Sequence, residues 1–486
     1  CIGREYRLSG FGLPASIVTR GAEVLASPVM LSVVKDGAEI ALKSTAGSFI
    51  GKKDIEAVYE STDASGELKL HSRVVVEYDG MMRVDVTLTP AKPLRLDRLS
   101  LSIVVKEPFA KYLILAQGFG GKSYYGGFQE TNFKFRPFVW FGDDERGLTW
   151  FCESAKDWKL KNKSRGIEIF RKDGNAALTV NMIDAGAEIS KPVTYTFGLM
   201  ATPMRPMPSD WRQWRISPGK NETIKIVWPS GIQKWYGYMP AVRDEDVFKK
   251  SLKQYHEKGV RAVPYTILNM LSSGVPEYKY FVGANCWNPQ HYDAASSDVM
   301  AIGDVVMGMC VNTRSWRDFV MHSYKQTLDK FDIDGVYYDI GWVEPCTNIA
   351  HGCGFIDDDD TIQPTFPVFA HRELAKRMYT LTRERCRNPF IIFHMSGCIE
   401  PPIHSFSDAV LDGEQFALSV KDDYTEFLPL DMMRAQFTMR QFGLVPVFLP
   451  GRDLHFSGND KTEAPTVGML ARLYLHDMHV WAIWCN

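Results

Sequence analysis

The chain has 486 residues, 23% of them charged, and a formal net charge of -2. This balance argues against the basic surface of a nucleic-acid-binding protein, and no apolar run reaches the roughly 18 residues of a membrane-spanning helix. The length exceeds what one hydrophobic core usually supports, so we expect at least two domains.

The first 200 residues have the pattern of β-structure. The stretch ELKLHSRVVVEYDGMMRVDVTLTP predicts a hairpin with its turn at Asp79 and Gly80, because apolar residues alternate with polar ones on both arms. Further short apolar segments, separated by Gly and Asp turns, continue to residue 200 without a long helical pattern. We therefore predict a β-sandwich domain over residues 1–200.

A different organisation begins after a proline-rich segment, residues 201–221, which we interpret as a linker. Over residues 222–486, apolar strands alternate with amphipathic helices, the pattern of a parallel sheet. Seven or eight strands in this length favour a (β/α)8 TIM barrel. The expected strands include 224–228, 260–268, 334–339, 390–396, 408–414 and 444–450, with a possible short one at 304–311. The expected helices include 245–259, 315–331, 371–386 and 430–443.

The active site of such a barrel lies at the C-terminal ends of its strands. Asp339 ends one strand, with Tyr337 on the same face because side chains alternate with period two. His394 ends the next strand, and Glu414 ends the one after that. By our count, the strands that carry Asp339 and Glu414 are the fourth and the sixth.

Two carboxylates facing each other across a barrel mouth are what glycosidic cleavage requires, since one attacks the sugar and the other protonates the leaving oxygen. We predict Asp339 as the nucleophile and Glu414 as the general acid/base. Asp412, two residues before Glu414, would supply negative charge or compete for the acid role. His394 is expected to contact a substrate hydroxyl, and Asp334, at the start of its strand, to be structural.

The loop after Asp339 contains Cys346, His351 and Cys353. We favour a disulfide between the two cysteines, with free thiols and a metal site as open alternatives. The spacing C-x4-H-x-C offers only three ligands, so we expect no metal and no other cofactor. His351 would then lie at the mouth of the site as a substrate contact, while the acidic run 357–360 would form a solvated loop.

Aromatic residues near the strand ends are candidates for stacking against a sugar. Trp235 follows the first strand of the expected barrel. Trp287 and His291 lie in the long segment after the second strand, where insertions commonly build a substrate subsite.

Four segments together resemble the glycoside hydrolase family 123-like group of bacterial proteins: FVWFGDDERGLTWFCESAKDW, YTFGLMATPMRPMP, DGVYYDIGWVEPCTNIAHGCG and FHMSG followed by SFSDAVLDGEQ. The resemblance implies a sandwich plus barrel and a bacterial carbohydrate hydrolase that is secreted, periplasmic or at the cell surface. Relatives cleave β-linked N-acetylgalactosamine with an adjacent Asp-Glu pair and the substrate's acetamido group as nucleophile. Here the nearest pair is Asp412 and Glu414, separated by Gly413. The strand-end acids instead resemble those of α-galactosidase-type barrels, whose nucleophile is an Asp.

The sequence therefore predicts a glycoside hydrolase for galactose- or N-acetylgalactosamine-type linkages in a complex glycan, retaining, with an Asp nucleophile and a Glu acid/base. One alternative is a substrate-assisted N-acetylhexosaminidase that uses Asp412 and Glu414. Another is a non-catalytic carbohydrate-binding protein on the same scaffold. The expected partner is an oligosaccharide or polysaccharide, with no nucleic acid and no transmembrane segment. The oligomeric state stays open.

Overall fold

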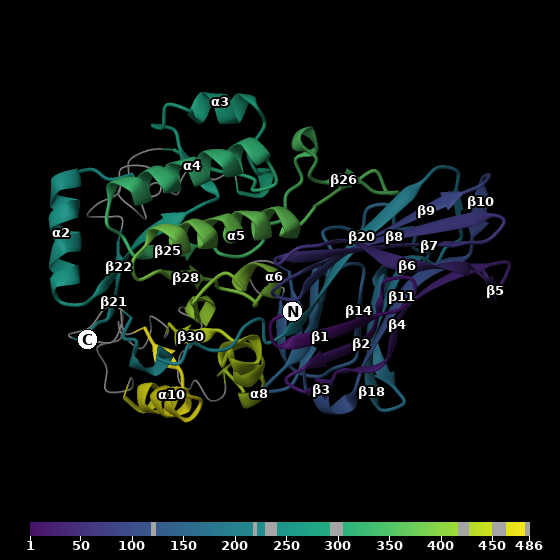
Figure 1. The fold of residues 1–486 in the computed structure, drawn as a ribbon, viewed down its shortest axis with the longest axis horizontal. Coiled ribbons are helices and arrows are strands. Elements are labelled where there is room, and N and C mark those ends of the chain that lie inside the picture. Colours follow the sequence, from purple (N-terminus) through teal and green to yellow (C-terminus); the bar gives the residue numbers. More distant parts are fainter. Residues whose placement is uncertain are drawn as a thin grey trace.

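The computed structural model describes residues 1–117, 123–216, 221–228, 241–291, 305–416, 427–449 and 463–481. Figure 1 shows two halves side by side: a β-rich half that holds the N-terminus, and a half in which helices surround a second sheet. No described helix is both long and apolar enough to span a membrane.

The N-terminal half consists mainly of two antiparallel sheets, as a β-sandwich requires. The larger sheet has nine strands, in the order β13 (Tyr124–Gly127), β12 (Tyr112–Ala116), β15 (Phe138–Gly142), β16 (Gly147–Phe151), β20 (Val193–Thr202), β9 (Met81–Pro90), β8 (Leu68–Glu77), β7 (Glu56–Ala64) and β6 (Lys43–Lys52). The smaller has six, in the order β14 (Thr131–Phe133), β17 (Ile167–Lys172), β18 (Asn175–Ile183), β11 (Arg98–Val105), β4 (Leu25–Lys35) and β5 (Ala38–Glu39). Small ribbons complete it: β1 (Arg4–Leu8), β2 (Pro14–Thr19), β3 (Ala22–Glu23), β10 (Leu94–Leu96) and β19 (Ala187–Ile189).

The hairpin predicted from the sequence is confirmed, because β8 and β9 pair on either side of Gly80. Gly80 has φ 81°, a left-handed conformation that glycine adopts without strain. Val74 and Val84 face each other across the pair and are both fully buried. The alternation seen in the sequence therefore directs one face of the hairpin into the core between the two sheets.

The second half contains a parallel sheet of seven strands that follow one another in chain order. They are β21 (Ile224–Val227), β22 (Arg261–Ile267), β25 (Gly335–Asp339), β28 (Phe390–His394), β29 (Ala409–Asp412), β30 (Val445–Phe448) and β31 (His479–Val480). The helices of this half are α2 (Glu245–Glu257), α3 (Tyr278–Gly283), α4 (Arg314–Lys330), α5 (Val368–Arg385), α6 (Pro401–His404), α8 (Leu430–Met432) and α10 (Glu463–Leu475). Sequential order and parallel pairing are typical of a barrel wall.

The structure shows a half-barrel where the sequence predicted a closed barrel. One face of the sheet buries its own aromatic and aliphatic cluster, to which Tyr265 and Tyr337 belong, while Tyr338 packs in the cluster on the helical face. Trp228, after β21, stacks on Trp481, after β31, with 5.7 Å between ring centroids. The sheet thus curls until residues beyond its edge strands touch, but no described residue forms a ladder between those strands.

Seven strands agree with the predicted seven or eight, but the predicted position of Asp339 and Glu414 in the strand order is wrong by one. The apolar segment 304–311 does contain a strand, β24 (Val306–Gly308), but it pairs antiparallel with β23 (Met270–Ser272) outside the main sheet. Consequently Asp339 ends the third strand of the sheet and Asp412 the fifth, rather than the fourth and sixth. The sequence of a three-residue strand does not determine which other strand it will pair with.

The predicted helices are confirmed with shifted ends, except for the one at 430–443. That segment forms the short helix α8, then a π-helical turn at Met433–Phe437 and a 3-10 turn at Arg440–Phe442. The helix predicted to begin at Ser315 begins at Arg314, with Thr313 at its N-cap position. Helical propensity alone does not fix such ends, because tertiary packing decides how the last turns close.

The segment predicted as a linker packs against the sheet. Trp214 is 6% exposed, and its ring meets Phe390 at the start of β28 edge-on at 5.0 Å. Trp211 packs in the same way on His479 in β31. Together the two tryptophans close the N-terminal end of the half-barrel interior.

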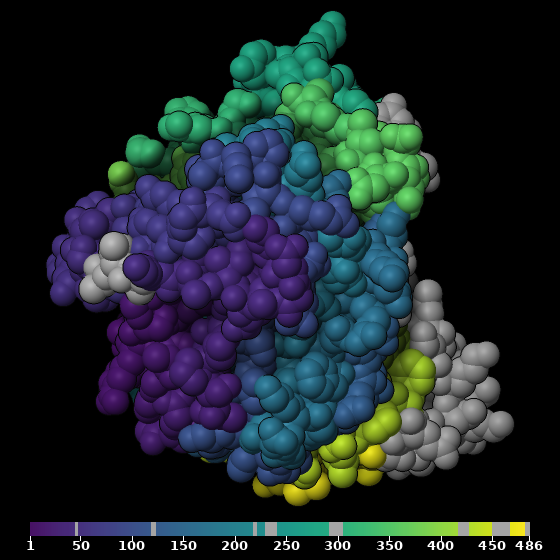
Figure 2. Space-filling model, turned by 90° about the vertical axis from the view of Figure 1, so that its right-hand side faces the viewer, coloured from purple at the N-terminus to yellow at the C-terminus, as the bar shows by residue number. Residues whose placement is uncertain are grey.

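The two halves meet across a polar seam. Arg372 on α5 is buried and binds Asp79 (2.8 Å) and Glu77 (3.1 Å) at the turn of the sandwich hairpin. Seen from the sandwich side, the second half is visible only around the margin, where green chain from around residue 360 rests against the sandwich (Figure 2). The sandwich therefore covers one side of the half-barrel.

Candidate functional site

Three strand ends converge on one histidine. His394, the last residue of β28, lies between Asp339 and Glu414: its Nδ1 is 2.9 Å from Asp339 Oδ1, and its Nε2 is 3.1 Å from Glu414 Oε2. Asp339 ends β25, and Glu414 opens the 3-10 turn that follows β29. The site residues predicted from strand order therefore lie together at the C-terminal edge of the parallel sheet.

Two glycines allow this convergence. A Cβ at Gly335, the first residue of β25, would lie 1.8 Å from the carbonyl oxygen of Phe390, so only glycine permits β25 and β28 to approach there. Gly413 has φ 116°, and a Cβ on it would lie 2.6 Å from the oxygen of Leu449. Because of the turn at Gly413, the side chains of Asp412 and Glu414 point in different directions.

The backbone is also strained directly beside Asp339. Ile340 has φ 56°, a left-handed conformation that is costly for a β-branched residue. In this conformation its N–H donates to Asp339 Oδ1 at 2.9 Å. Strain of this kind persists where the surrounding structure enforces it, which is common at active sites.

Asp339 is held in its ionised form. Burial alone would raise its pKa, but the charge of His394 and the hydrogen bonds from His394, Tyr265 and the Ile340 amide lower it overall. The Tyr265 hydroxyl donates to Oδ2. An ionised carboxylate is the form required of a nucleophile.

His394 has the opposite shift. Burial favours its neutral form, but Asp339 and Glu414 outweigh burial and raise its pKa to about 10. The ring is therefore an imidazolium at neutral pH. Its side chain is 7% exposed, whereas that of Asp339 is 20% and that of Glu414 is 41% exposed. Both carboxylates are thus more exposed to a ligand than the imidazolium between them.

Asp412 does not point the same way as Glu414. Its Oδ2 accepts from Gln436 Nε2 and its Oδ1 from the Gly413 amide, both at 2.8 Å. Burial raises the pKa of Asp412 to about 7. Its neighbours in β29, Ala409 and Leu411, face the half-barrel interior. By alternation, Asp412 lies toward the helical face.

Several residues of the site escaped the sequence reasoning. Tyr265 lies inside a strand and carried no signal beyond its alternation with Val263. Tyr125 comes from the sandwich: its hydroxyl accepts from Gln415 at 3.4 Å, and its ring packs edge-on against Phe437. Only the folded structure can place a sandwich strand against the segment after β29.

The remaining predicted contacts are distributed differently. Tyr337 is fully buried, and its hydroxyl lies 2.6 Å from His394 Nδ1, so it supports the histidine from within the wall. Trp287 is partly buried and packs against the hydrophobic cluster on the helical face of the sheet. Its backbone forms an isolated antiparallel β-bridge with Met309. Trp235 and the side chain of His291 lie outside the described residues.

The disulfide expected between Cys346 and Cys353 is not formed: both residues carry free, buried thiols. His351 is likewise not a free side chain at the mouth. Its Nε2 lies 3.3 Å from Cys346 Sγ, and its Nδ1 lies 2.6 Å from the oxygen of Asn285. The loop folds these groups inward, because 3-10 residues 349–351 are capped by the Asn348 side chain. Asp334 meets expectation as a structural residue, binding the Ala262 amide and His256.

The acidic run at 357–360 is not simply a solvated loop. Three of its aspartates pair with lysines of the sandwich, namely Lys134 with Asp357, Lys159 with Asp358 and Lys163 with Asp359. These contacts border a groove of about 590 Å³ between the two halves. The run therefore ties the loop after β25 to the sandwich.

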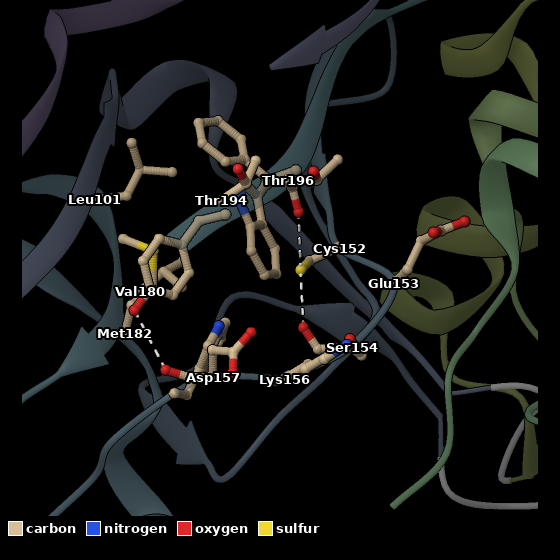
Figure 3. Close-up of a pocket in the computed structure, with 14 residues that line it drawn as sticks. Leu101, Cys152, Glu153, Ser154, Lys156, Asp157, Val180, Met182, Thr194 and Thr196 are labelled. Atoms are coloured by element: carbon tan, nitrogen blue, oxygen red, sulfur yellow. Dashed lines mark hydrogen bonds between the residues drawn. The ribbon is translucent and has the colours of Figure 1, made fainter. Parts of the chain in front are cut away.

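A separate cavity of about 200 Å³ lies inside the sandwich (Figure 3). The Cys152 thiol points into it and donates to the oxygens of Thr196 and Ser154. Glu153 points away from it toward the helical half, where it accepts from the Phe369 amide at 2.9 Å. None of the predicted site residues lines this cavity.

Two family models match parts of the chain. Residues 1–156 match the third domain of glycoside hydrolase 123. The first third of the chain is therefore similar to a glycoside hydrolase 123 domain. This match confirms the resemblance to that family predicted from the sequence. Residues 228–355 match a domain of unknown function, DUF6259. No curated protein matches the chain.

Solved structures with distant similarity are glycosidases. One is the alpha-galactosidase from Lactobacillus brevis, with a TM-score of 0.45, 11% identity, and coverage of 99% of this chain and 75% of that one. Another is the alpha-N-acetylgalactosaminidase NagBb from Bifidobacterium bifidum, with a TM-score of 0.41, 11% identity, and coverage of 99% of this chain and 87% of that one. A third is the galactosidase domain of alpha-galactosidase-sucrose kinase AgaSK, with a TM-score of 0.40 and 9% identity. The match covers 78% of this chain and 62% of that one. These TM-scores are too low to support an argument about mechanism.

Proposed function

We propose that the protein hydrolyses galactose- or N-acetylgalactosamine-type linkages in a complex glycan, with Asp339 as nucleophile and Glu414 as general acid/base. The single observation that supports this most is the line of Asp339, His394 and Glu414 at the C-terminal edge of the sheet. Two carboxylates open to a ligand, with one held ionised, satisfy the chemistry of glycosidic cleavage. The sugar class follows from the family 123-like resemblance. As in that group, we expect a secreted, periplasmic or cell-surface enzyme.

In the first step, a carboxylate oxygen of Asp339 bonds to the anomeric carbon while the bond to the leaving oxygen breaks. The leaving oxygen takes a proton from Glu414. In the second step, water attacks the anomeric carbon, Glu414 removes the water's proton, and Asp339 is released. Each carboxyl group ends the cycle in its starting form.

His394 gives Glu414 a source for that proton. His394 Nε2 lies 3.1 Å from Glu414 Oε2, within reach of direct proton transfer. We infer that Glu414 receives a proton from His394 Nε2 as the leaving oxygen develops charge, and that in the second step the proton removed from water returns through Glu414 to His394. His394 is then a positioning residue and proton reservoir.

The substrate-assisted alternative has less support. It requires Asp412 to orient an acetamido group beside Glu414, but Gln436 and the Gly413 amide already bind both oxygens of Asp412. Cleavage of galactosides that lack an acetamido group would separate the two mechanisms.

The first test is a screen of aryl α- and β-galactosides and N-acetylgalactosaminides with the wild-type protein, followed by proton NMR of the first product anomer. Retention is expected. Asp339→Asn and Glu414→Gln should each lower kcat by about 10³-fold or more at unchanged melting temperature. Asp332→Asn, an exposed acid on another loop, is the control and should keep wild-type kcat. Near-full activity in either active-site variant would reject the assignment, and an inverted first product would reject Asp339 as nucleophile.

A further inference from the structure

A second cluster of reactive side chains lies in the loops beyond the parallel sheet. The sulfur atoms of Cys310, Cys346 and Cys353 and one ring nitrogen of His351 all lie within 4.8 Å of one another. Cys310 follows β24, some 36 residues before Cys346 in the chain. It supplies the fourth group that the loop sequence C-x4-H-x-C lacks.

We propose that these four residues bind a structural Zn²⁺ ion. Three thiolates and one imidazole are an established ligand set for zinc, and four protein ligands leave no open position for a substrate. The proposal concerns the loops that frame the site and is independent of the glycosidase mechanism.

The distances fit a shared metal ion. In a tetrahedral site with Zn–S bonds of about 2.3 Å, two sulfurs lie about 3.8 Å apart, and a sulfur and a nitrogen lie about 3.5 Å apart. Here Cys310 Sγ is 3.7 Å from Cys353 Sγ, and Cys346 Sγ is 3.3 Å from His351 Nε2. A disulfide would need sulfurs about 2.05 Å apart. The cysteines are therefore spaced as ligands of one ion.

The imidazole is oriented as metal-binding histidines usually are. Nδ1 of His351 lies 2.6 Å from the carbonyl oxygen of Asn285, which can only accept a hydrogen bond. The Nδ1–H therefore donates to this oxygen, and the lone pair of Nε2 points at the sulfurs. A backbone carbonyl on the second ring nitrogen is the common outer partner of a zinc-bound histidine.

The loop itself is built to hold these positions. The Asn348 side chain donates to the oxygens of Asn285 (3.2 Å) and Trp287 (3.0 Å) and accepts from the Ala350 amide, so it fixes the loop against a neighbouring segment. Gly352 has φ 84°, a left-handed turn that returns the chain to Cys353. The cysteines thus converge on a preformed site.

Burial argues against three thiols placed there as ordinary packing. Cys346 and Cys353 are fully buried and Cys310 is 2% exposed, and the three form a small cluster of their own, apart from the aliphatic cores. Buried free cysteines do behave as small apolar residues. A polar imidazole at 3.3 Å from a thiol is not an apolar neighbour, but it is the expected neighbour when both bind a cation.

A bound ion would therefore link two loops at the C-terminal edge of the parallel sheet. Cys310 lies three residues before the Thr313 cap of α4, and Cys346 lies seven residues after Asp339. An ion shared by these residues would hold the loop after β25 to the loop before α4, and would do so without touching the carboxylates.

The test is metal analysis of the full chain, purified in reductant without chelator. Wild-type protein is expected to contain about one zinc per chain, and Cys310→Ser and Cys346→Ser to retain at least tenfold less after desalting. The matched control is Cys286→Ser, a cysteine that is 2% exposed in the same region, whose sulfur lies near the Ser315 hydroxyl instead. It should keep the zinc of the wild type.

A second measurement needs no variant. Protein exchanged with Co²⁺ should show thiolate-to-cobalt charge transfer in the near ultraviolet and the intense visible bands of tetrahedral cobalt. His351→Cys, a conservative replacement that gives four thiolates, should keep these bands with a shifted spectrum. Substoichiometric zinc together with absent cobalt bands in the wild type would overturn the proposal. So would a disulfide within the cluster, found by non-reducing peptide mapping of freshly purified protein.

Discussion

Two histidines beyond the same parallel sheet have opposite surroundings. His394 lies between the carboxylates of Asp339 and Glu414, which keep a proton on each ring nitrogen. His351 lies between a carbonyl oxygen and a thiol, an arrangement that leaves Nε2 free to bind a metal. We propose that the first imidazole serves the chemistry and that the second binds a metal ion.

The contrast shows that a histidine's role follows from its neighbours rather than from its place at a strand end or in a loop. Carboxylates favour the imidazolium form, whereas a carbonyl acceptor on Nδ1 keeps the proton of a neutral ring on that nitrogen and leaves the lone pair on Nε2. We therefore propose that the same type of side chain stores a proton in one site and binds a metal ion in the other.

The largest effect should come from exchanging the two histidines for glutamine in parallel. His394→Gln removes the charge between the carboxylates and the proton source for Glu414, so kcat should fall by about 10²-fold or more. His351→Gln should leave kcat near wild type and lower the melting temperature instead. Steady-state kinetics and calorimetry on both variants measure the contrast. A His351 variant that loses activity as fully as the His394 variant would abolish the distinction.

A smaller effect concerns stability against pH. The pKa of His394 is raised from 6.5 to about 10 in the folded protein. Its stabilising contribution is therefore fully present below about pH 6.5 and is lost as pH rises through about 10. The difference in unfolding free energy between wild type and His394→Gln should shrink across this window in urea titrations.

The His351→Gln variant provides the control for that window. Its difference from wild type should not follow the same curve, because no carboxylate faces His351 among the contacts described. A difference between wild type and His394→Gln that stays constant from pH 6.5 to 10 would show that the imidazolium is not stabilised by its two neighbours.

The smallest effect is expected for Tyr265→Phe. The variant removes one hydrogen bond to Asp339, so the pKa of Asp339 should rise while His394 and Ile340 still hold the carboxylate. The acidic limb of kcat/KM should move to higher pH, and kcat should fall by about tenfold or less. Tyr324→Phe, which alters a hydroxyl contact to Thr382 far from the site, should leave the limb in place.

Much of the carboxylate site could be predicted from sequence because its logic is local. Period-two alternation put Tyr337 and Asp339 on one face, and the sequential order of parallel strands brought their ends together. The predicted roles of Asp339 and Glu414 stay predictions. The same alternation puts Asp412 on the helical face, where it binds Gln436, whereas Glu414 lies beyond the turn at Gly413.

The cysteine cluster could not be predicted, since its fourth member is distant in the chain. The motif around Cys346 and Cys353 offered three ligands, and nothing in the sequence connects Cys310 to them. The strand numbering failed for the same reason: β24 pairs antiparallel with β23 outside the main sheet, and such pairing depends on tertiary contacts. The sandwich contacts of residues 357–359 are equally non-local.

The contacts of Arg372 bear on whether the two halves of the molecule could fold separately. Its guanidinium is 2% exposed on α5, yet both of its anionic partners, Glu77 and Asp79, belong to the sandwich hairpin. A chain cut at the proline-rich segment would leave this cation without a counter-charge, and removing one partner of a buried pair costs about 3–5 kcal/mol. The sandwich thus supplies the counter-charge for a buried cation of the parallel-sheet half, so we expect the two halves to fold as one unit.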